Sequence, residues 1–157
     1  MRHTVSALVE NKSGVLARIS TLFAARGYNI DSLSVGETED PTVSRMTIVV
    51  NGDEHILEQI EKQLNKLIDV IKVSEYSSIP HIERDLALIK VKVDKTNRSE
   101  LLEIVDIFRA KIVDVSTNSV IIEVTGDEEK IQALIELVRP FGIKELARTG
   151  VIAMARK

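Results

Sequence analysis

The stretch Glu10-Asn11-Lys12-Ser13-Gly14-Val15-Leu16 marks the place where a strand pattern ends and a helix pattern begins. Apolar and polar residues alternate over residues 4–10, whereas from residue 15 onward the apolar residues recur at helical spacing. Asn11 and Ser13 can accept hydrogen bonds from the free N–H groups of the first helical turn, and Gly14 leaves that backbone open to a ligand. This turn is therefore either a simple capped helix start or one side of a ligand site.

Composition and charge restrict the class of protein. The chain has 157 residues, enough for one ordinary domain or two small ones, and it is 44% hydrophobic and 29% charged, as soluble globular proteins are. Its formal charge of -3 is spread over interleaved acidic and basic residues, which disfavours nucleic acid and membrane surfaces as partners. The absence of cysteine excludes disulfides and thiolate chemistry. With no apolar targeting segment after Met1, a cytoplasmic protein is expected.

Residues 1–76 predict the order β-α-β-β-α-β, which is the ferredoxin-like arrangement. The first helix should end at Arg26-Gly27, where glycine can take the left-handed conformation. Strands are expected over residues 28–35, 43–50 and 70–76, with a polar loop at 36–42. Asp53 is the expected cap of the second helix.

The same order of elements repeats after a short segment rich in small polar residues. We expect a first ferredoxin-like domain at residues 1–77, a linker at 78–83 and a second ferredoxin-like domain at 84–157. Gly52-Asp53-Glu54 recurs as Gly126-Asp127-Glu128, which supports a duplication. The second copy lacks the long loop at 36–42 and has no glycine at its first strand-to-helix turn. Features found only in the first unit are therefore the better functional candidates.

Catalytic motifs are not apparent in the chain. His3, His55 and His81 have no ligand spacing, and each is expected to be a solvated residue. No dinucleotide-binding, P-loop or nucleophile-elbow pattern occurs. The expected central strands carry no aromatic residue for stacking on RNA bases. A small acylphosphatase-like enzyme remains an alternative, although the turn offers Lys12 where that class would use arginine.

The first unit resembles an ACT domain, and the whole chain resembles the regulatory small subunits of acetohydroxyacid (acetolactate) synthase. The resemblance is carried by five stretches, which are ENKSGVLAR (residues 10–18), RGYNIDSL (26–33), DPTVSRMTI (40–48), EQIEKQLNKL (58–67) and ARTGVIAM (147–154). It implies an α+β protein of two tandem ferredoxin-like units. It also implies a non-catalytic subunit that activates the catalytic large subunit and confers feedback inhibition by valine or another branched-chain amino acid. A free-standing amino-acid sensor acting on another target is the alternative.

The resemblance further implies that cofactors and effector are separated. Thiamine diphosphate, magnesium and flavin belong to the large subunit, so neither cofactor nor metal is expected in this chain. The family forms homodimers through the ACT domains, and the effector is held where the strand-to-helix turn of one protomer meets the second strand of the other. The residues expected to bind it are Asn11, Gly14, Val15, Leu16, Asn29 and Ile30.

Each part of an amino-acid effector has an expected partner at that joint. The helix N-terminal N–H groups near Gly14, Val15 and Leu16 suit the carboxylate, because free donors and the helix dipole favour an anion. The side-chain oxygen of Asn11 can accept from the ammonium group. Asn29 can add a polar contact, and Ile30 with Val15 or Leu16 can enclose a small aliphatic side chain.

Overall fold

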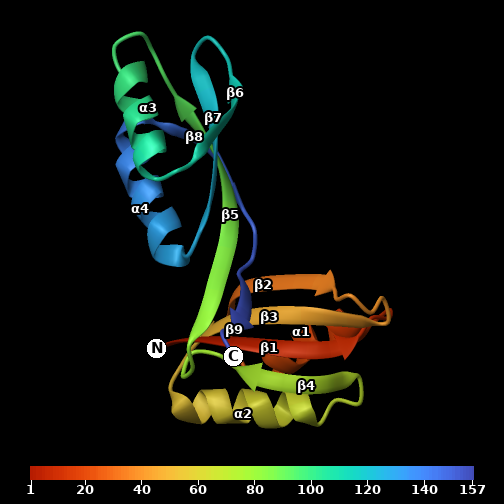
Figure 1. Ribbon diagram of the computed structural model, residues 1–157. Coiled ribbons are helices and arrows are strands. Elements are labelled where there is room, and N and C mark those ends of the chain that lie inside the picture. Colours follow the sequence, from red (N-terminus) through yellow and green to blue (C-terminus); the bar gives the residue numbers. More distant parts are fainter. The chain divides into compact units, whose positions relative to one another are not determined.

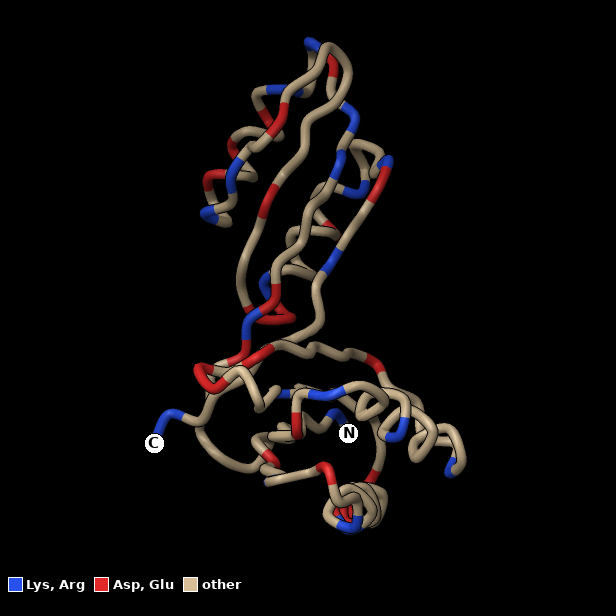
Figure 2. Tube along the Cα trace, turned by 90° about the vertical axis from the view of Figure 1, so that its right-hand side faces the viewer, with Lys and Arg blue, Asp and Glu red and all other residues tan.

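The computed structural model describes residues 1–157 and divides the chain into two compact units. The first unit consists of residues 1–82 together with residues 150–157, and the second consists of residues 83–149. Each unit pairs one antiparallel sheet with two helices (Figure 1). Acidic and basic residues are interspersed along both units, so neither sign dominates (Figure 2).

The first unit follows the predicted order of elements. Its sheet has the strand order β2-β3-β1-β4 with antiparallel neighbours, so β2 and β4 are the edge strands. The elements are β1 (Arg2–Glu10), α1 (Val15–Ala25), β2 (Ile30–Glu37), β3 (Val43–Asn51), α2 (Glu54–Asn65) and β4 (Val70–Glu75). The ferredoxin-like prediction is thus confirmed for this unit.

Alternation along the strands determines which face of the sheet the helices cover. Val5, Ala7 and Val9 of β1 are buried in one core together with Ile19 of α1 and Ile60 of α2. Successive strand residues point to opposite faces, so Thr4 and Ser6 lie on the other face of the same sheet. Both are nevertheless buried, which means that this second face is also covered.

The second unit repeats the arrangement with a shorter hairpin. Its main sheet order is β6-β7-β5-β8, again antiparallel, and two helices cover one face. The elements are β5 (His81–Lys92), α3 (Arg98–Ile107), β6 (Lys111–Val115), β7 (Ser119–Gly126), α4 (Glu128–Val138), the 3₁₀ turn η1 (Arg139–Phe141) and β8 (Ile143–Arg148). The second predicted ferredoxin-like unit is therefore present.

The domain boundaries differ from the expected ones at two places. The last eight residues, expected in the second domain, belong to the first unit. Their strand β9 (Ile152–Ala155) pairs with β5, whose first two residues, His81 and Ile82, also belong to the first unit. The expected linker at 78–83 is partly a strand, because β5 begins at His81. Short apolar alternation in the tail indicated an extended segment but carried no information about which sheet it would join.

The expected helix ends at Asp53 and Gly27 are observed, and Asp127 is a further aspartate cap. Asp53 Oδ1 accepts from the N–H of Ile56 at 2.9 Å, and Asp127 does the same for Lys130 at 2.9 Å. Gly27 takes the left-handed conformation at φ +69°, as expected after α1. The prediction that Asn11 or Ser13 caps α1 is wrong, because the cap residue is Gly14 and no side chain bonds to that helix end.

His3 is also placed differently from the expectation. It was expected in solvent, but its side chain is only 2% exposed, and its Nε2 lies 3.1 Å from the carbonyl oxygen of Gly52. His3 lies on the same face of β1 as the core residues Val5 and Ala7. Strand alternation therefore predicts that it is buried once the strand is known to begin before it.

None of the helices is both long enough and apolar enough to cross a membrane.

The caps generate a matched pair of stability predictions. Asp53→Ala should lower the free energy of unfolding by about 1 kcal/mol, the usual loss when a capping side chain is removed. Ser13→Ala is the control, because Ser13 makes no cap bond and its replacement should leave the value unchanged. Urea unfolding followed by circular dichroism measures both. Equal losses in the two variants would contradict the assignment of the caps.

Candidate functional site

The β1–α1 turn (residues 11–14) requires glycine for two separate reasons. Gly14 has φ +87°, a conformation that other residues rarely adopt. A Cβ atom at this position would also lie 3.1 Å from Nη1 of Arg18. Glycine at residue 14 thus permits the left-handed turn and leaves the Arg18 guanidinium undisturbed beside the start of α1.

A buried carboxylate holds this turn in place. Asp69 lies in the connection between α2 and β4, and its side chain is 7% exposed. Its Oδ2 accepts from Nε of Arg18 at 2.7 Å, and its Oδ1 lies 3.3 Å from Nζ of Lys12. The main-chain oxygen of Asp69 also accepts from the N–H of Glu10 at 2.9 Å. The turn is thus attached to α1 and to the α2–β4 connection at once.

The ion pairs shift the pKa values of the groups that form them. Burial raises the pKa of Asp69, but the hydrogen bonds and charges of Arg18 and Lys12 outweigh it and bring the pKa below its ordinary value. The pKa of Lys12 is raised because its ammonium group is hydrogen-bonded to the carboxylates of Glu10, which has the larger effect, and Asp69. Both groups are therefore charged at neutral pH, and the charges of Lys12 and Arg18 are largely satisfied within the protein.

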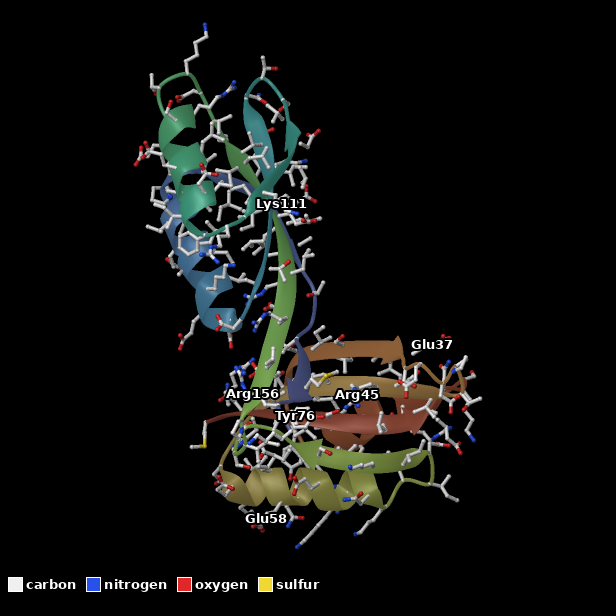
Figure 3. The ribbon with its side chains drawn as sticks, in the orientation of Figure 1. Glu37, Arg45, Glu58, Tyr76, Lys111 and Arg156 are labelled. Atoms are coloured by element: carbon white, nitrogen blue, oxygen red, sulfur yellow. The ribbon has the colours of Figure 1, made fainter.

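Asn11 joins the turn to the hairpin of β2 and β3. Its Nδ2 donates to the carbonyl oxygen of Pro41 at 2.9 Å and to Oε1 of Glu37 at 3.2 Å. Figure 3 shows Glu37 at the hairpin end of β2. The amide nitrogen is occupied in this way, so the amide oxygen is the atom that Asn11 can offer to a ligand. The loop found only in the first unit thus contacts the candidate turn.

Val15 and Leu16 contribute differently from one another. The side chain of Val15 is 3% exposed and belongs to the core, whereas that of Leu16 is 44% exposed. The sequence left open which of the two would enclose an aliphatic ligand, and only Leu16 is available for it. The backbone N–H of Val15 makes one long hydrogen bond, to the carbonyl oxygen of Lys12 at 3.5 Å.

Asn29 and Ile30 lie at the other end of the sheet. β1 and β2 are both antiparallel to β3, so they run in the same direction, and the start of β2 is remote from the end of β1. Nδ2 of Asn29 donates to Oδ1 of Asp31 at 2.6 Å, and Asp31 also accepts from Asn51. One chain therefore brings together Asn11, Gly14, Val15 and Leu16 but neither Asn29 nor Ile30.

Sequence reasoning did not identify the residues that support the turn. Arg18 and Asp69 are far apart in the chain, and no local pattern links them. The one available signal is that Asp69 is an acidic residue among Leu67, Ile68 and Val70, where an unpaired charge would be costly to bury. No group of three or more His, Asp or Glu side chains is arranged to hold a metal ion.

The lowered pKa of Asp69 predicts how stability depends on pH. Its ionised form stabilises the folded chain above the ordinary pKa of 3.8, and this contribution is lost as the pH falls through the lower folded-state value. Between about pH 7 and about pH 3, the parent should therefore lose more unfolding free energy than Asp69→Asn does. Urea unfolding at the two pH values measures the difference. Identical losses in both proteins would contradict the proposed role of the ion pairs.

Comparisons with known proteins match both parts of the chain. A family model described as the AHAS small subunit-like ACT domain matches residues 5–72, and one described as the small subunit of acetolactate synthase matches residues 84–157. Together they extend over most of the sequence.

Complete relatives give the same result. The probable acetolactate synthase small subunit of Archaeoglobus fulgidus is 59% identical, with 99% of this chain and 98% of that protein covered. The acetolactate synthase small subunit of Aquifex aeolicus is 57% identical over 99% of this chain and 82% of its own length. The crystal structure of the Thermotoga maritima small subunit matches with a TM-score of 0.91 at 46% identity, covering 100% of this chain and 98% of that one. The chain therefore belongs to the acetolactate synthase small subunits, and its N-terminal part is an ACT domain.

Proposed function

We propose that this chain is a non-catalytic regulatory subunit that activates the catalytic large subunit and makes it sensitive to valine or another branched-chain amino acid. The observation that carries the proposal is the division of the expected effector residues between the two ends of β2. In one chain the β1–α1 turn lies near the end of β2, and Asn29 with Ile30 lies at its start. A complete site therefore needs the turn of one copy and the start of β2 from a second copy. Membership of the small-subunit family supports the partner.

The topology supplies the way in which two copies can meet. β2 is an edge strand, so one side of its backbone is free to pair with another strand. Two β2 strands related by a twofold axis pair antiparallel, which places Asn29 and Ile30 of one copy beside the Glu37 end of the other. Because Asn11 is hydrogen-bonded to Glu37, the β1–α1 turn lies at that same end.

The residues assembled in this way match the three parts of an aliphatic amino acid. Its carboxylate accepts hydrogen bonds from the N–H groups at the start of α1, where Gly14 leaves access. Its ammonium group is bound by the amide oxygen of Asn11, with the carboxylate of Glu37 nearby. Leu16 and the Ile30 side chain of the other copy enclose the aliphatic part. One methylene alters such a fit by only ~1 to 3 kcal/mol, so similar amino acids should be distinguished modestly.

The catalytic chemistry in this proposal belongs entirely to the partner. Thiamine diphosphate, magnesium and flavin are assigned to the large subunit, and this chain contributes regulation. Effector binding at the β2 joint is proposed to stabilise a less active state of the holoenzyme, through a difference in effector affinity between two states that is commonly ~1 to 3 kcal/mol.

A pair of substitutions at Gly14 tests whether the carboxylate of the effector binds near this residue. Gly14→Asp should weaken inhibition by about tenfold or more while activation of the large subunit is retained, because its carboxylate repels that of the ligand. Gly14→Asn is the control, since asparagine has nearly the same shape and also tolerates positive φ. It should weaken inhibition less. Holoenzyme assays with increasing valine measure both effects, and a Gly14→Asp variant as sensitive as the parent would exclude this site.

A pull-down with calorimetry tests the function as a whole. The tagged chain should capture a thiamine-dependent synthase from extract of its own organism and raise the activity of that enzyme. The dimer alone should bind a branched-chain amino acid in calorimetry. Binding without the synthase would favour a free-standing sensor, and turnover of a substrate by this chain alone would favour an enzyme. Either result would overturn the proposal.

A further inference from the structure

The last eight residues of the chain form a tail that packs on the first unit (residues 150–157, the C-terminal tail). The tail contacts β2, the strand whose first residues are expected to bind the effector. Figure 1 shows β9 of the tail beside the strands of the first sheet. Nothing in the effector site described above accounts for this contact.

The backbone of the tail lies against the backbone of β2 at Gly150. A Cβ atom at this position would lie 2.0 Å from the carbonyl oxygen of Leu33, 2.5 Å from its carbonyl carbon and 3.0 Å from the nitrogen of Ser34. All three are backbone atoms of β2, so no side-chain rotation can relieve the overlap. Any residue other than glycine must therefore displace either the tail or the strand.

Specific contacts continue along the tail. The N–H of Val151 donates to Oγ of Ser32 at 2.9 Å, and the N–H of Arg156 donates to the carbonyl oxygen of Pro80 at 3.1 Å. Val151 and Ala153 are each 6% exposed, whereas Met154 is 67% exposed. The tail thus buries alternate residues, as a strand lying on a sheet face does.

The tail contacts β2 next to an irregularity in its pairing with β3. Ile30 pairs with Val50 and Ser32 with Val49, so the register shifts between them. Such an irregularity leaves a residue unpaired and bends the strand. The tail contacts the two residues that follow this irregularity, Ser32 and Leu33, which also pair with β3.

The face that the tail covers contains a polar network that also fixes the sheet. Arg45 of β3 donates from Nη1 to the hydroxyl oxygens of Ser6 and Tyr76 (Figure 3). Tyr76 is 7% exposed, and Ser6 is 2% exposed. β1, β3 and the end of β4 are thereby joined to one another independently of the tail. The start of β2 is outside this network, so displacement of the tail should affect β2 selectively.

We propose that Gly150 and Val151 are positioning residues for effector binding. They act through β2. By holding Ser32 and Leu33, they keep the preceding residues Asn29 and Ile30 in the position that pairing with a second copy requires. The inference rests on the proposed function, because the effector site at β2 is part of that proposal. It assigns to the end of the chain a role in amino-acid affinity that is separate from any contact with the ligand.

The test uses the full-length chain, with valine as the probe in calorimetry. Gly150→Ala should weaken valine binding by roughly 5- to 150-fold, the usual range for coupled sites. Ser32→Ala removes only the acceptor for Val151 and should weaken binding less, in the same direction. Met154→Ala is the control, because it changes an exposed side chain of the same tail, and its affinity should equal that of the parent.

Two further measurements distinguish positioning from general damage to the fold. Activation of the large subunit should be retained in all three variants. Amide hydrogen exchange should increase in Gly150→Ala within residues 29–33 and 150–156, with the other strands of the first sheet unchanged. Normal valine affinity in both Gly150→Ala and Ser32→Ala, or exchange that increases throughout the sheet, would overturn the inference.

The parent protein separates this inference from the proposed function. If the parent binds valine and both variants do so equally well, the positioning inference fails while the proposed function stands. If the parent binds no branched-chain amino acid, the proposed effector site fails, and the positioning inference for valine fails with it.

Discussion

The carboxylate of Asp69 is the constraint on which the candidate site depends. A buried acid without partners would be costly, and Arg18 with Lys12 supplies the compensating charges. Each of the three groups comes from a different element, so satisfying the acid also fixes the start of α1 relative to β1 and β4. The helix end is left without a capping side chain, and Gly14 keeps its backbone accessible. The ion pairs of Asp69 therefore hold a helix start that no side chain caps.

The duplication clarifies what is scaffold and what is specific. Both units have the same order of elements, and each second helix is capped by an aspartate in the same Gly-Asp-Glu setting. Only the first unit combines a glycine cap with a hairpin loop that reaches the turn, through the bonds from Asn11 to Pro41 and Glu37. These differences lie at the end of the sheet where we propose that the carboxylate and ammonium group of the effector bind. The features on which the proposed effector site depends are thus present in the first unit and absent from the second.

Local patterns predicted the elements well because each element is specified by short-range chemistry. Alternation placed β1, helical spacing placed α1, and Asp53 and Asp127 marked the helix starts. The errors concern relations between distant residues. Burial of His3 depends on the register of β1, the ion pairs of Asp69 depend on tertiary packing, and the position of the tail depends on which sheet accepts it. The family resemblance supplied the effector residues, whose separation along β2 became evident only in three dimensions.

The return of the C-terminal tail makes the first unit discontinuous in sequence. The second unit is, in topological terms, an insertion between residue 82 and residue 150 of the first. Domains are made from the N-terminus onward during protein synthesis. The first unit begins to fold early, but the segment that covers β2 leaves the ribosome only after the inserted unit. A nascent chain consequently acquires the complete ACT domain only after the inserted unit has been synthesised, and exchanging the inserted unit between relatives requires two junctions rather than one.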